Sequence, residues 1–568
     1  MDLLKCSGLT ALEVFAITKV ASCLQTDGLS ATQAGCILLV IQYLLLKCYR
    51  VFLYPKYFSP FRHLPGPTDN HFFFGQFLNF LKAETPTSLY TKWIRQHPGA
   101  PLIRYLSFAN TEVIVPTSVE LFKEILQTHC YSFQKAHHWR RMMKNLSGEG
   151  IIVMESDKHR THRKMLNGPY STTSVRKLEP TFKSKAVEMT QVFDRAIAAN
   201  RYGSTGVIDC TECFSNTTLD IMGIAILGID LGNLAATAFD GSSKTPDQDA
   251  ELTFAEAYRI IFAQGPLGEI ITYIGGFIPI RWLPIRVNRE YLLATSWLEN
   301  YLTELVRKRR TEIAASVAAG KHEKSDSRDL ITFLTEESLP GGLAEGIAEI
   351  EVVGHLLQFM AAGHETSANL LSWSLYTMAE RPHIQSKLYE ELSGLDDDPV
   401  FTALNKLPYL DNFIKEVLRI YPPGKHHLVT FVMVMELIAA AAVGMFRETA
   451  VDVTLQGVKF PKGTTFDIIP SVPMLNPFIW GKDVDEPDPT RWDRLSGDNA
   501  SPYAFEAFSQ GPRICIGRQM ALMETKIILA EIVRNFRILK VEKEFKVENP
   551  SPVMRPSGLE VRFERITG

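Results

Sequence analysis

The feature that most constrains this chain is a ten-residue segment, Phe508 to Gly517, with the sequence FSQGPRICIG. Gly511 and Gly517 have no Cβ, so the backbone can turn tightly around Cys515 and approach a flat ligand closely. The helix expected from Arg518 onward offers the sulfur its N–H donors and the positive end of its dipole. A cysteine held in this way can serve as a thiolate ligand of a metal.

A thiolate at Cys515 suits a haem iron, because its negative charge pushes electron density through the metal and favours O–O cleavage. Arg513 can pair with a haem propionate through its fork of N–H donors, and Phe508 is expected to pack beside the macrocycle. The alternative is an inert core cysteine in an ordinary loop. That alternative suffices for Cys515 alone but not for the whole ten-residue pattern.

A second motif, AGHET at Ala362 to Thr366, lies in the apolar, proline-free stretch Glu349 to Ala379, which predicts a buried helix. Gly363 is expected to leave room against a flat ligand. The Thr366 hydroxyl can turn onto the carbonyl of Ala362, loosen the helix and leave a place for water or O2. Glu365 can relay protons beside it. Alone, the motif is better explained by an ordinary buried helix with a satisfied threonine; its occurrence with the cysteine segment favours function.

A third motif places Glu416 and Arg419 three residues apart, on one helix face. A surface pair is the alternative, but the flanks are apolar and Pro422-Pro423 ends the helix. We therefore expect a buried pair that acts as a structural brace and not as a catalyst.

The composition fits one large catalytic domain. Apolar residues make up 46 % and charged residues 22 % of the chain, close to a globular average. Helical spacing dominates, and it predicts helices over Leu89–His97, Val119–His129, Thr181–Ala199, Tyr291–Ala315 and Leu522–Phe536. Strand signals are few and short: Pro101–Tyr105, Glu112–Val115, Val453–Leu455 and Thr465–Ile469. We expect a mainly α fold with small β-sheets. The net charge of -3 gives no sign of a nucleic-acid partner.

An apolar run near the N-terminus, Ala34 to Leu46, reaches with its flanks the roughly 20 residues that span a bilayer. Basic residues follow it closely, which predicts a single-pass transmembrane helix with the downstream chain in the cytosol. A cleaved signal peptide is the alternative, disfavoured because no basic segment directly precedes the run. We expect an anchor segment (1–55), a proline-rich hinge (56–67) and a catalytic domain (68–568).

Together the three motifs resemble those of the cytochrome P450 superfamily. Its haem-ligand loop is matched from Phe508 to Gly517, its oxygen-activation helix at Ala362, Gly363, Glu365 and Thr366, and its brace at Glu416 and Arg419. The family's meander arginine resembles Arg491. The resemblance covers roughly Pro65 to the C-terminus, and the anchor and proline segment look like those of fungal members in the endoplasmic reticulum membrane.

The resemblance implies the cytochrome P450 fold, with haem b (iron protoporphyrin IX) bound through the Cys515 thiolate. It implies a monooxygenase (EC class 1.14) that inserts one atom of O2 into a lipophilic small molecule, with Thr366 and Glu365 assisting proton delivery. A role in fungal secondary-metabolite biosynthesis is expected. No flavin domain is evident, so electrons are expected from a separate NADPH-cytochrome P450 reductase. Arg160, Arg163 and Lys164 form part of its docking face or else an ordinary solvated helix face.

Two departures from the family stand out. In place of a tryptophan and an arginine four residues apart, this chain has His159 and Arg163. Arg163 is expected to pair with a propionate and His159 to donate a hydrogen bond. In addition, an apolar insert, Lys425 to Met445, precedes Arg447, a further candidate propionate partner. A membrane span there would separate Glu416 and Arg419 from Cys515, so we hypothesise a retained intron or a gene-model artefact.

Two other functions stay open. One is an O2-independent haem-thiolate isomerase or dehydratase, which would have no use for Glu365 and Thr366. The other is an inactive haem- or lipid-binding membrane protein, if the insert is real and displaces Arg447. The substrate pocket is expected to be apolar and lined partly by Phe359, Ala362 and Thr366.

Overall fold

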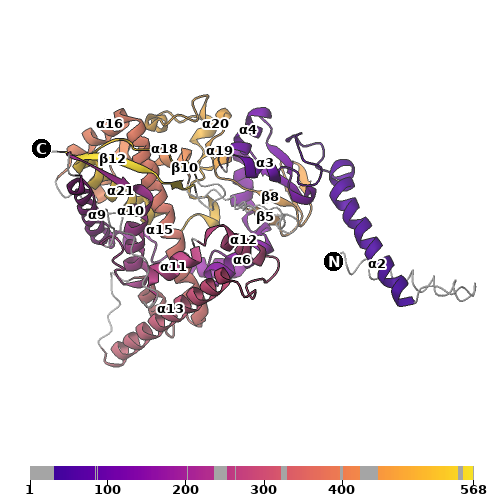
Figure 1. Ribbon diagram of the computed structural model, residues 1–568, viewed down its shortest axis with the longest axis horizontal. Coiled ribbons are helices and arrows are strands. Elements are labelled where there is room, and N and C mark those ends of the chain that lie inside the picture. The colour runs from indigo at the N-terminus through magenta and orange to yellow at the C-terminus, as the bar shows by residue number, and fades with distance from the viewer. Residues whose placement is uncertain are drawn as a thin grey trace, which may run out of the picture.

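The structure is a computed structural model that describes residues 31–566, apart from 84, 86, 201–202, 236–251, 263, 321–328, 397–400, 423–445 and 548–553. Helix α15 (Glu349–Glu380) runs through the centre of the body (Figure 1). Its sequence is apolar on every side, and its buried hydroxyls bond within the helix, as when Ser374 donates to the carbonyl of Leu370 at 2.7 Å. Such a helix must be enclosed by others.

Several helices pack directly against α15, among them α10 (Cys210–Met222), α13 (Arg286–Ala318), α18 (Pro408–Ile420) and α21 (Arg518–Asn535). Helix α9 (Glu179–Ala199) covers α21 and α10. The remaining helices are α3 (Phe77–Lys82), α4 (Ser88–Gln96), α5 (Val119–Lys123), α6 (His137–Ser147), α7 (Ser156–Leu166), α8 (Thr172–Arg176), α11 (Phe254–Phe262), α12 (Gly265–Gly275), α14 (Leu330–Glu337), α16 (Pro382–Ser393), α17 (Phe401–Leu404), α19 (Ser471–Met474) and α20 (Pro477–Trp480).

Two sheets flank this helical body. The larger has the order β1-β2-β8-β5-β3, with β1 (Leu102–Leu106), β2 (Glu112–Pro116), β3 (Phe133–Lys135), β5 (Phe446–Thr449) and β8 (Thr465–Asp467). Among the strands that the structure describes, only β2 and β8 pair in parallel. The second sheet has the order β4-β12-β9, with β4 (Thr205–Asp209), β9 (Phe536–Val541) and β12 (Glu560–Arg565). Two hairpin-sized pairs complete the set: β6 (Val453–Leu455) with β7 (Val458–Phe460), and β10 (Lys546–Val547) with β11 (Pro556–Ser557).

The mainly α fold with small sheets is thus confirmed, and all five predicted helices are present. Val119–His129 consists of α5 followed by a π-helical turn, η3 (Glu124–Thr128). The four predicted strands correspond to β1, β2, β6 and β8, but strands such as β3, β4, β9 and β12 were not predicted. The insert 425–445 lies outside the described residues.

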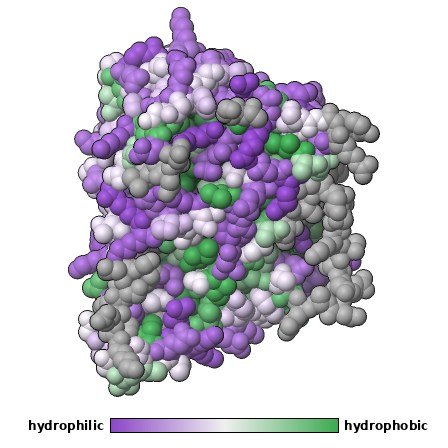
Figure 2. Space-filling model, turned by 90° about the vertical axis from the view of Figure 1, so that its left-hand side faces the viewer, coloured by the Kyte–Doolittle hydropathy of each residue, from purple (hydrophilic) through white to green (hydrophobic). Residues whose placement is uncertain are grey.

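Near the N-terminus, α2 (Ala31–Cys48) and the π-helical segment η1 (Tyr49–Phe58) form one helix that projects from the body (Figure 1). The stretch Cys36–Phe58 is long and apolar enough to cross a membrane, and nearly all of its described side chains are exposed or half-buried, with Pro55 as the buried exception. The opposite face of the molecule is mostly hydrophilic, with separate small apolar patches (Figure 2). The exposed apolar surface of this helix is what a lipid-facing segment requires.

The end of this helix is fastened to the β1–β2 hairpin. The carbonyl of Val51 accepts a hydrogen bond from Asn110 (2.9 Å), and that of Pro55 accepts one from Arg104 (2.5 Å). Glu112 accepts from both Ser59 (2.5 Å) and Arg104 (2.7 Å). The segment expected to be a proline-rich hinge is therefore held by specific contacts at its start.

Candidate functional site

A cavity of about 360 Å³ lies between α15 and the loop that precedes α21. It brings together the two motifs that are about 150 residues apart: Ala362, Gly363 and Thr366 line it from α15, and Phe508, Arg513, Cys515 and Gly517 line it from the loop. Phe359 lines it as well, and most of the remaining wall is apolar: Ile151, Ile152, Met222, Leu370, Leu418 and Met520.

Cys515 is held by the backbone around it. Its N–H donates to the carbonyl of Phe508 at 2.8 Å, which closes the loop. Burial raises the pKa of the Cys515 thiol, while hydrogen bonds from the N–H groups of Gly517 and Arg518 and the charge of Arg163 act in the opposite direction. The start of α21 thus supplies donors to the sulfur, and a bound cation would add the charge that favours the thiolate.

The glycines of the two motifs have different roles. Gly511 has φ +71°, and a Cβ there would overlap the carbonyl oxygen of Leu126, so this glycine makes the tight turn. A Cβ at Gly517 would meet only the Cys515 sulfur, at 3.9 Å. Gly363 lines the cavity beside Met222 of α10, and a Cβ there would lie 2.5 Å from the sulfur of Met222. The absence of a Cβ at Gly363 thus leaves room for the Met222 side chain at the cavity wall.

Thr366 donates its hydroxyl to the carbonyl of Ala362 at 2.7 Å, one turn back along α15. The helix is continuous through this turn, so the bond does not interrupt it. A second hydroxyl approaches the same turn, because Thr218 of α10 donates to the carbonyl of His364 at 2.9 Å. Two side-chain hydroxyls therefore donate to carbonyls of this turn, in addition to the backbone hydrogen bonds of the helix.

Glu365 does not line the cavity; its carboxylate lies 3.6 Å from the guanidinium of Arg555. Burial raises the pKa of Glu365, and Arg555 lowers it. Thr366, the next residue, faces the cavity. The acid and the hydroxyl are thus adjacent along the helix but point to different surroundings.

One end of the cavity is strongly cationic. Lys135, Arg447, Arg513 and His159 all line it, and β3 and β5 place Lys135 opposite Arg447. The one carboxylate that pairs with this group in the described part of the chain is Glu155, which lies 3.3 Å from Lys135 and also binds Arg513. Like charges crowded in a buried place repel, so this end favours an anionic ligand.

The protonation states reflect that crowding. Burial, with the nearby Arg447, lowers the pKa of Lys135 to about 7. Burial and Arg513 likewise lower the pKa of Arg447 to about 10 and that of His159 to about 3. His159 is therefore neutral, and its Nδ1 lies 3.2 Å from the Tyr131 hydroxyl. Lys135 and Glu155 were not identified from the sequence, because a short strand and a loop carry no motif.

The Nε and Nη1 of Arg513 are buried without a hydrogen-bond partner among the described residues. An unpaired buried guanidinium N–H is costly, so these two donors indicate a missing acceptor. Arg163 is differently engaged: its Nη1 donates to the carbonyl of Ile514 at 2.7 Å and its Nε to Asn167 at 3.1 Å. It supports the cysteine loop directly while also lining the cavity.

A second acid was also missed. Glu524 of α21 lines the cavity and is 1 % exposed, and Ser367 donates to its Oε2 at 2.9 Å. Burial raises the pKa of Glu524 to about 8, so it is mostly protonated at neutral pH. The Glu524–Ser367 bond connects the helix after Cys515 to the helix of Thr366.

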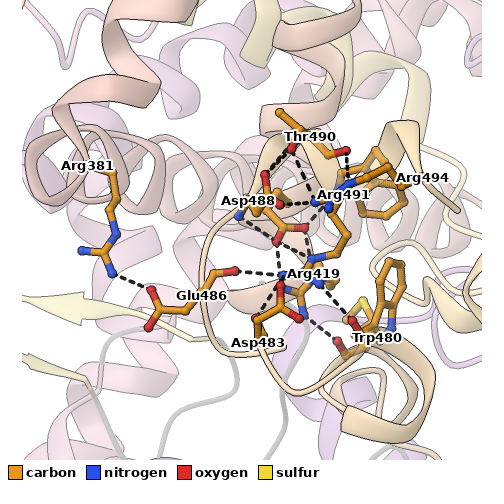
Figure 3. Close-up of polar contacts among 12 residues, drawn as sticks. Arg381, Arg419, Trp480, Asp483, Glu486, Asp488, Thr490, Arg491 and Arg494 are labelled. Carbon is orange, nitrogen blue, oxygen red and sulfur yellow. Dashed lines mark hydrogen bonds and ion pairs between the residues drawn. The ribbon is translucent and has the colours of Figure 1, made fainter.

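Glu416, Arg419 and Arg491 lie together outside the cavity. Arg419 binds both oxygens of Glu416, at 2.9 and 2.8 Å, and Arg491 approaches Glu416 at 3.3 Å. Trp492 donates to the same carboxylate at 3.0 Å. Carbonyls of Met474 and Trp480 accept the remaining donors of the two arginines, and Asp483 pairs with Arg491 (Figure 3). The pair is buried and fully hydrogen-bonded, which is the geometry expected of a brace.

A family model described as Cytochrome P450 matches residues 64–433 and 434–563 of this chain. The match thus covers most of the chain in two pieces, and the boundary between them lies within the apolar insert.

Curated relatives are similar over most of their length. Cytochrome P450 monooxygenase sphH of Aspergillus fumigatus is 27 % identical over 92 % of this chain and 91 % of its own. Cytochrome P450 monooxygenase FSL4 of Gibberella zeae is 26 % identical over 87 % of this chain and 85 % of its own. Cytochrome P450 monooxygenase FUM15 of Gibberella moniliformis is 26 % identical, over 88 % and 85 %.

Proposed function

The chain belongs to the cytochrome P450 family, and we propose that Cys515 is the axial ligand of its haem b and that the enzyme inserts one atom of O2 into a lipophilic small molecule. The observation that carries the proposal is the cavity itself. It contains a sulfur held by N–H donors at one wall, the Thr366 hydroxyl on α15, and a cationic end with unpaired arginine donors.

The residues present fit a haem. Cys515 would hold the iron, and Arg513, Arg447 and Lys135 would bind the two propionates, with His159 as a further donor. Phe508 and the apolar walls would enclose the macrocycle. Bound there, the haem supplies the redox centre at which O2 is activated.

The protein's own contribution is to position groups and to deliver protons. Thr366 donates to Ala362, which leaves its oxygen free to accept a hydrogen bond from a water in the cavity. Glu365, which lies beside Arg555, exchanges protons with this water through further waters. Burial raises the pKa of its carboxyl, which makes it easier to protonate than an exposed one. The apolar walls exclude bulk water and favour an apolar substrate.

We infer that electrons come from a separate NADPH-cytochrome P450 reductase. Arg160 and Lys164 of α7 would contact the reductase. Arg163 would not, because it points inward and donates to the carbonyl of Ile514. Salt-sensitive reduction kinetics are expected, since exposed charge pairs are screened. We further propose a single-pass anchor in the endoplasmic reticulum membrane, with the catalytic domain in the cytosol, and a role in fungal secondary-metabolite biosynthesis.

The decisive experiment is the absorption spectrum of the reduced, CO-treated protein. The wild type should show the strongly red-shifted Soret band of thiolate ligation, and Cys515→Ser should lose it. Cys48→Ser, which removes an exposed cysteine at the end of α2, should leave the band unchanged. An unaltered band in Cys515→Ser, or no haem in the wild type, would refute the proposal. Turnover under argon would point instead to an O2-independent isomerase or dehydratase.

For the insert 425–445 we keep the hypothesis of a retained intron. It is supported by the break in the family match at 433/434 and by the position of α18 and β5 in one folded body. Transcript reads that all retain the insert would contradict it.

A further inference from the structure

A basic groove lies on the other side of the loop that walls the cavity. Ile151 and Ile152 line the cavity, and the next residues of the same loop, from Val153 to Glu155, line the groove. The groove has a volume of about 570 Å³. Its lining residues, which we call the α6 groove, are His137, Arg140, Arg141, Lys144, Glu149, Val153, Met154, Glu155 and Lys158.

The cations come mainly from one face of α6. His137, Arg140, Arg141 and Lys144 are spaced at three, four and seven residues, which places them on one side of a helix. The other side is apolar, where Met142 packs against Tyr273 of α12. Helix α6 is therefore amphipathic, with its cationic face toward the groove.

The acids of the groove are already engaged. Glu149 pairs with Lys144 and lies 3.5 Å from Lys158, which also binds Glu351 at 2.6 Å. Glu155 is turned to Lys135 and Arg513 at the cavity end. The lysines of the groove are thus neutralised by carboxylates.

Arg140 and Arg141 differ from these lysines. Across the described ranges of the chain, neither guanidinium lies within ion-pair distance of a carboxylate. Arg141 donates to the carbonyl of Phe277 at 3.3 Å, and the buried Nε of Arg140 has no acceptor among the described residues. Glu448 of β5 is influenced by the charge of Arg140, but burial raises its pKa more.

Apolar side chains are exposed beside this face. Phe277, which stacks on His138 of α6, is 37 % exposed, and Ile278 and Trp282 are 47 % and 74 % exposed. Two guanidinium groups without a carboxylate partner among the described residues, next to exposed apolar side chains, suit a molecule with an anionic head and an apolar tail.

We propose that the α6 groove binds the carboxylate or phosphate head of an amphiphilic molecule through Arg140 and Arg141. The head would accept the free donors of the two guanidinium groups, and the tail would lie against Phe277 and Ile278. The head can belong to a fatty-acid-like small molecule or to an anionic phospholipid. This site does not depend on the haem and holds whether or not Cys515 binds iron.

The test measures protection of arginines in the full-length, detergent-solubilised protein. Phenylglyoxal modifies accessible arginines, and peptide mass spectrometry gives the rate at each one. Dodecanoate should slow modification of Arg140 and Arg141 about threefold at twice its dissociation constant, because about a third of the sites are then empty. Dodecanol should not. Arg286 of α13, an exposed arginine paired with Glu290, is the internal control and should react at an unchanged rate.

Parallel samples with inorganic phosphate, and with the protein in vesicles of phosphatidylcholine with or without phosphatidic acid, identify the source of the head. Protection by dodecanoate or phosphate indicates a small oxyanion, and protection by phosphatidic acid alone indicates a lipid headgroup. The proposal is overturned if no anion protects, if dodecanol protects equally, or if Arg286 is protected to the same extent. In calorimetry, Arg140→Gln/Arg141→Gln should bind dodecanoate about tenfold more weakly, and Arg286→Gln should not.

Discussion

At the scale of single residues, the cavity depends on groups that are satisfied only in part. Thr366 has a carbonyl partner and still faces the cavity, Arg513 has a carboxylate partner and two unpaired donors, and Glu524 has one bonded and one unpaired oxygen. Unpaired buried groups are costly in a folded protein, so they mark where a ligand is needed.

Thr366→Ala should lower product formation about 10²-fold, because it removes the hydroxyl proposed to deliver protons. Haem content and the CO spectrum should stay as in the wild type, since the hydroxyl of Thr366 bonds to the carbonyl of Ala362 in its own helix. Thr366→Ser retains a hydroxyl and should restore most of the activity. Equal product formation by Thr366→Ala and the wild type would exclude this role.

Glu524 predicts a pH dependence of stability. The unfolded chain loses this proton near the ordinary pKa of 4.5, and the folded chain near 8, so the folded state holds the extra proton between them. The free energy of unfolding of the wild type should therefore fall, relative to Glu524→Gln, as pH rises from about 5 to 8.

The measurement is the thermal midpoint of both proteins at several pH values. Ser367→Ala removes the hydrogen bond that lowers the Glu524 pKa and should steepen the fall. If the thermal midpoints of the wild type and Glu524→Gln change with pH in parallel, the carboxyl of Glu524 has an ordinary pKa and the prediction fails.

At the scale of elements, long helices were predictable and short strands were not. Helix α15 was predicted from a mostly apolar, proline-free stretch, Glu349 to Ala379, and proved to end one residue later, at Glu380. The three residues of β3 have no periodicity of their own and gain their conformation by pairing with β5, more than 300 residues away. Lys135 could not be assigned from sequence for the same reason: its surroundings come from β5 and from the cysteine loop.

Of the candidate site, the sequence predicted the residues that carry family motifs, which includes Cys515 and Thr366. It did not predict their partners. Met222, which lies against Gly363 at the cavity wall, belongs to a helix for which no motif exists. Motifs specify single residues, whereas packing between distant helices follows from the whole chain.

The brace connects α18 to the segment around Arg491, and its removal should be severe. Glu416→Gln leaves Arg419 buried without a countercharge and leaves Arg491 with Asp483 alone, which should cost about 3–5 kcal/mol of stability. Glu564→Gln breaks an exposed pair with Arg537 and should cost less than about 1 kcal/mol. Thermal or denaturant unfolding of the two variants compares them directly; similar losses would contradict a structural role for the buried pair.

At the scale of the whole molecule, the junction between the projecting helix and the β1–β2 hairpin is the feature most open to test. Glu112→Ala removes the acceptor of both Ser59 and Arg104. Trypsin should then cut faster after Lys56 and Arg62, as limited proteolysis followed by mass spectrometry would reveal. Glu120→Ala on α5 is the matched control and should be cut at the wild-type rate. If trypsin cuts Glu112→Ala and Glu120→Ala at the same rate, Glu112 does not hold the junction.

That junction also bears on how a tethered enzyme meets a bilayer. A domain on a flexible linker samples all orientations relative to the membrane, whereas a domain that is fixed to its membrane helix tilts together with that helix. If α2 and η1 span the bilayer, its thickness sets their tilt. That tilt in turn sets the distance between the opening of the cavity and the membrane surface. The depth in the bilayer from which the enzyme takes up its substrates would then change with the lipid composition.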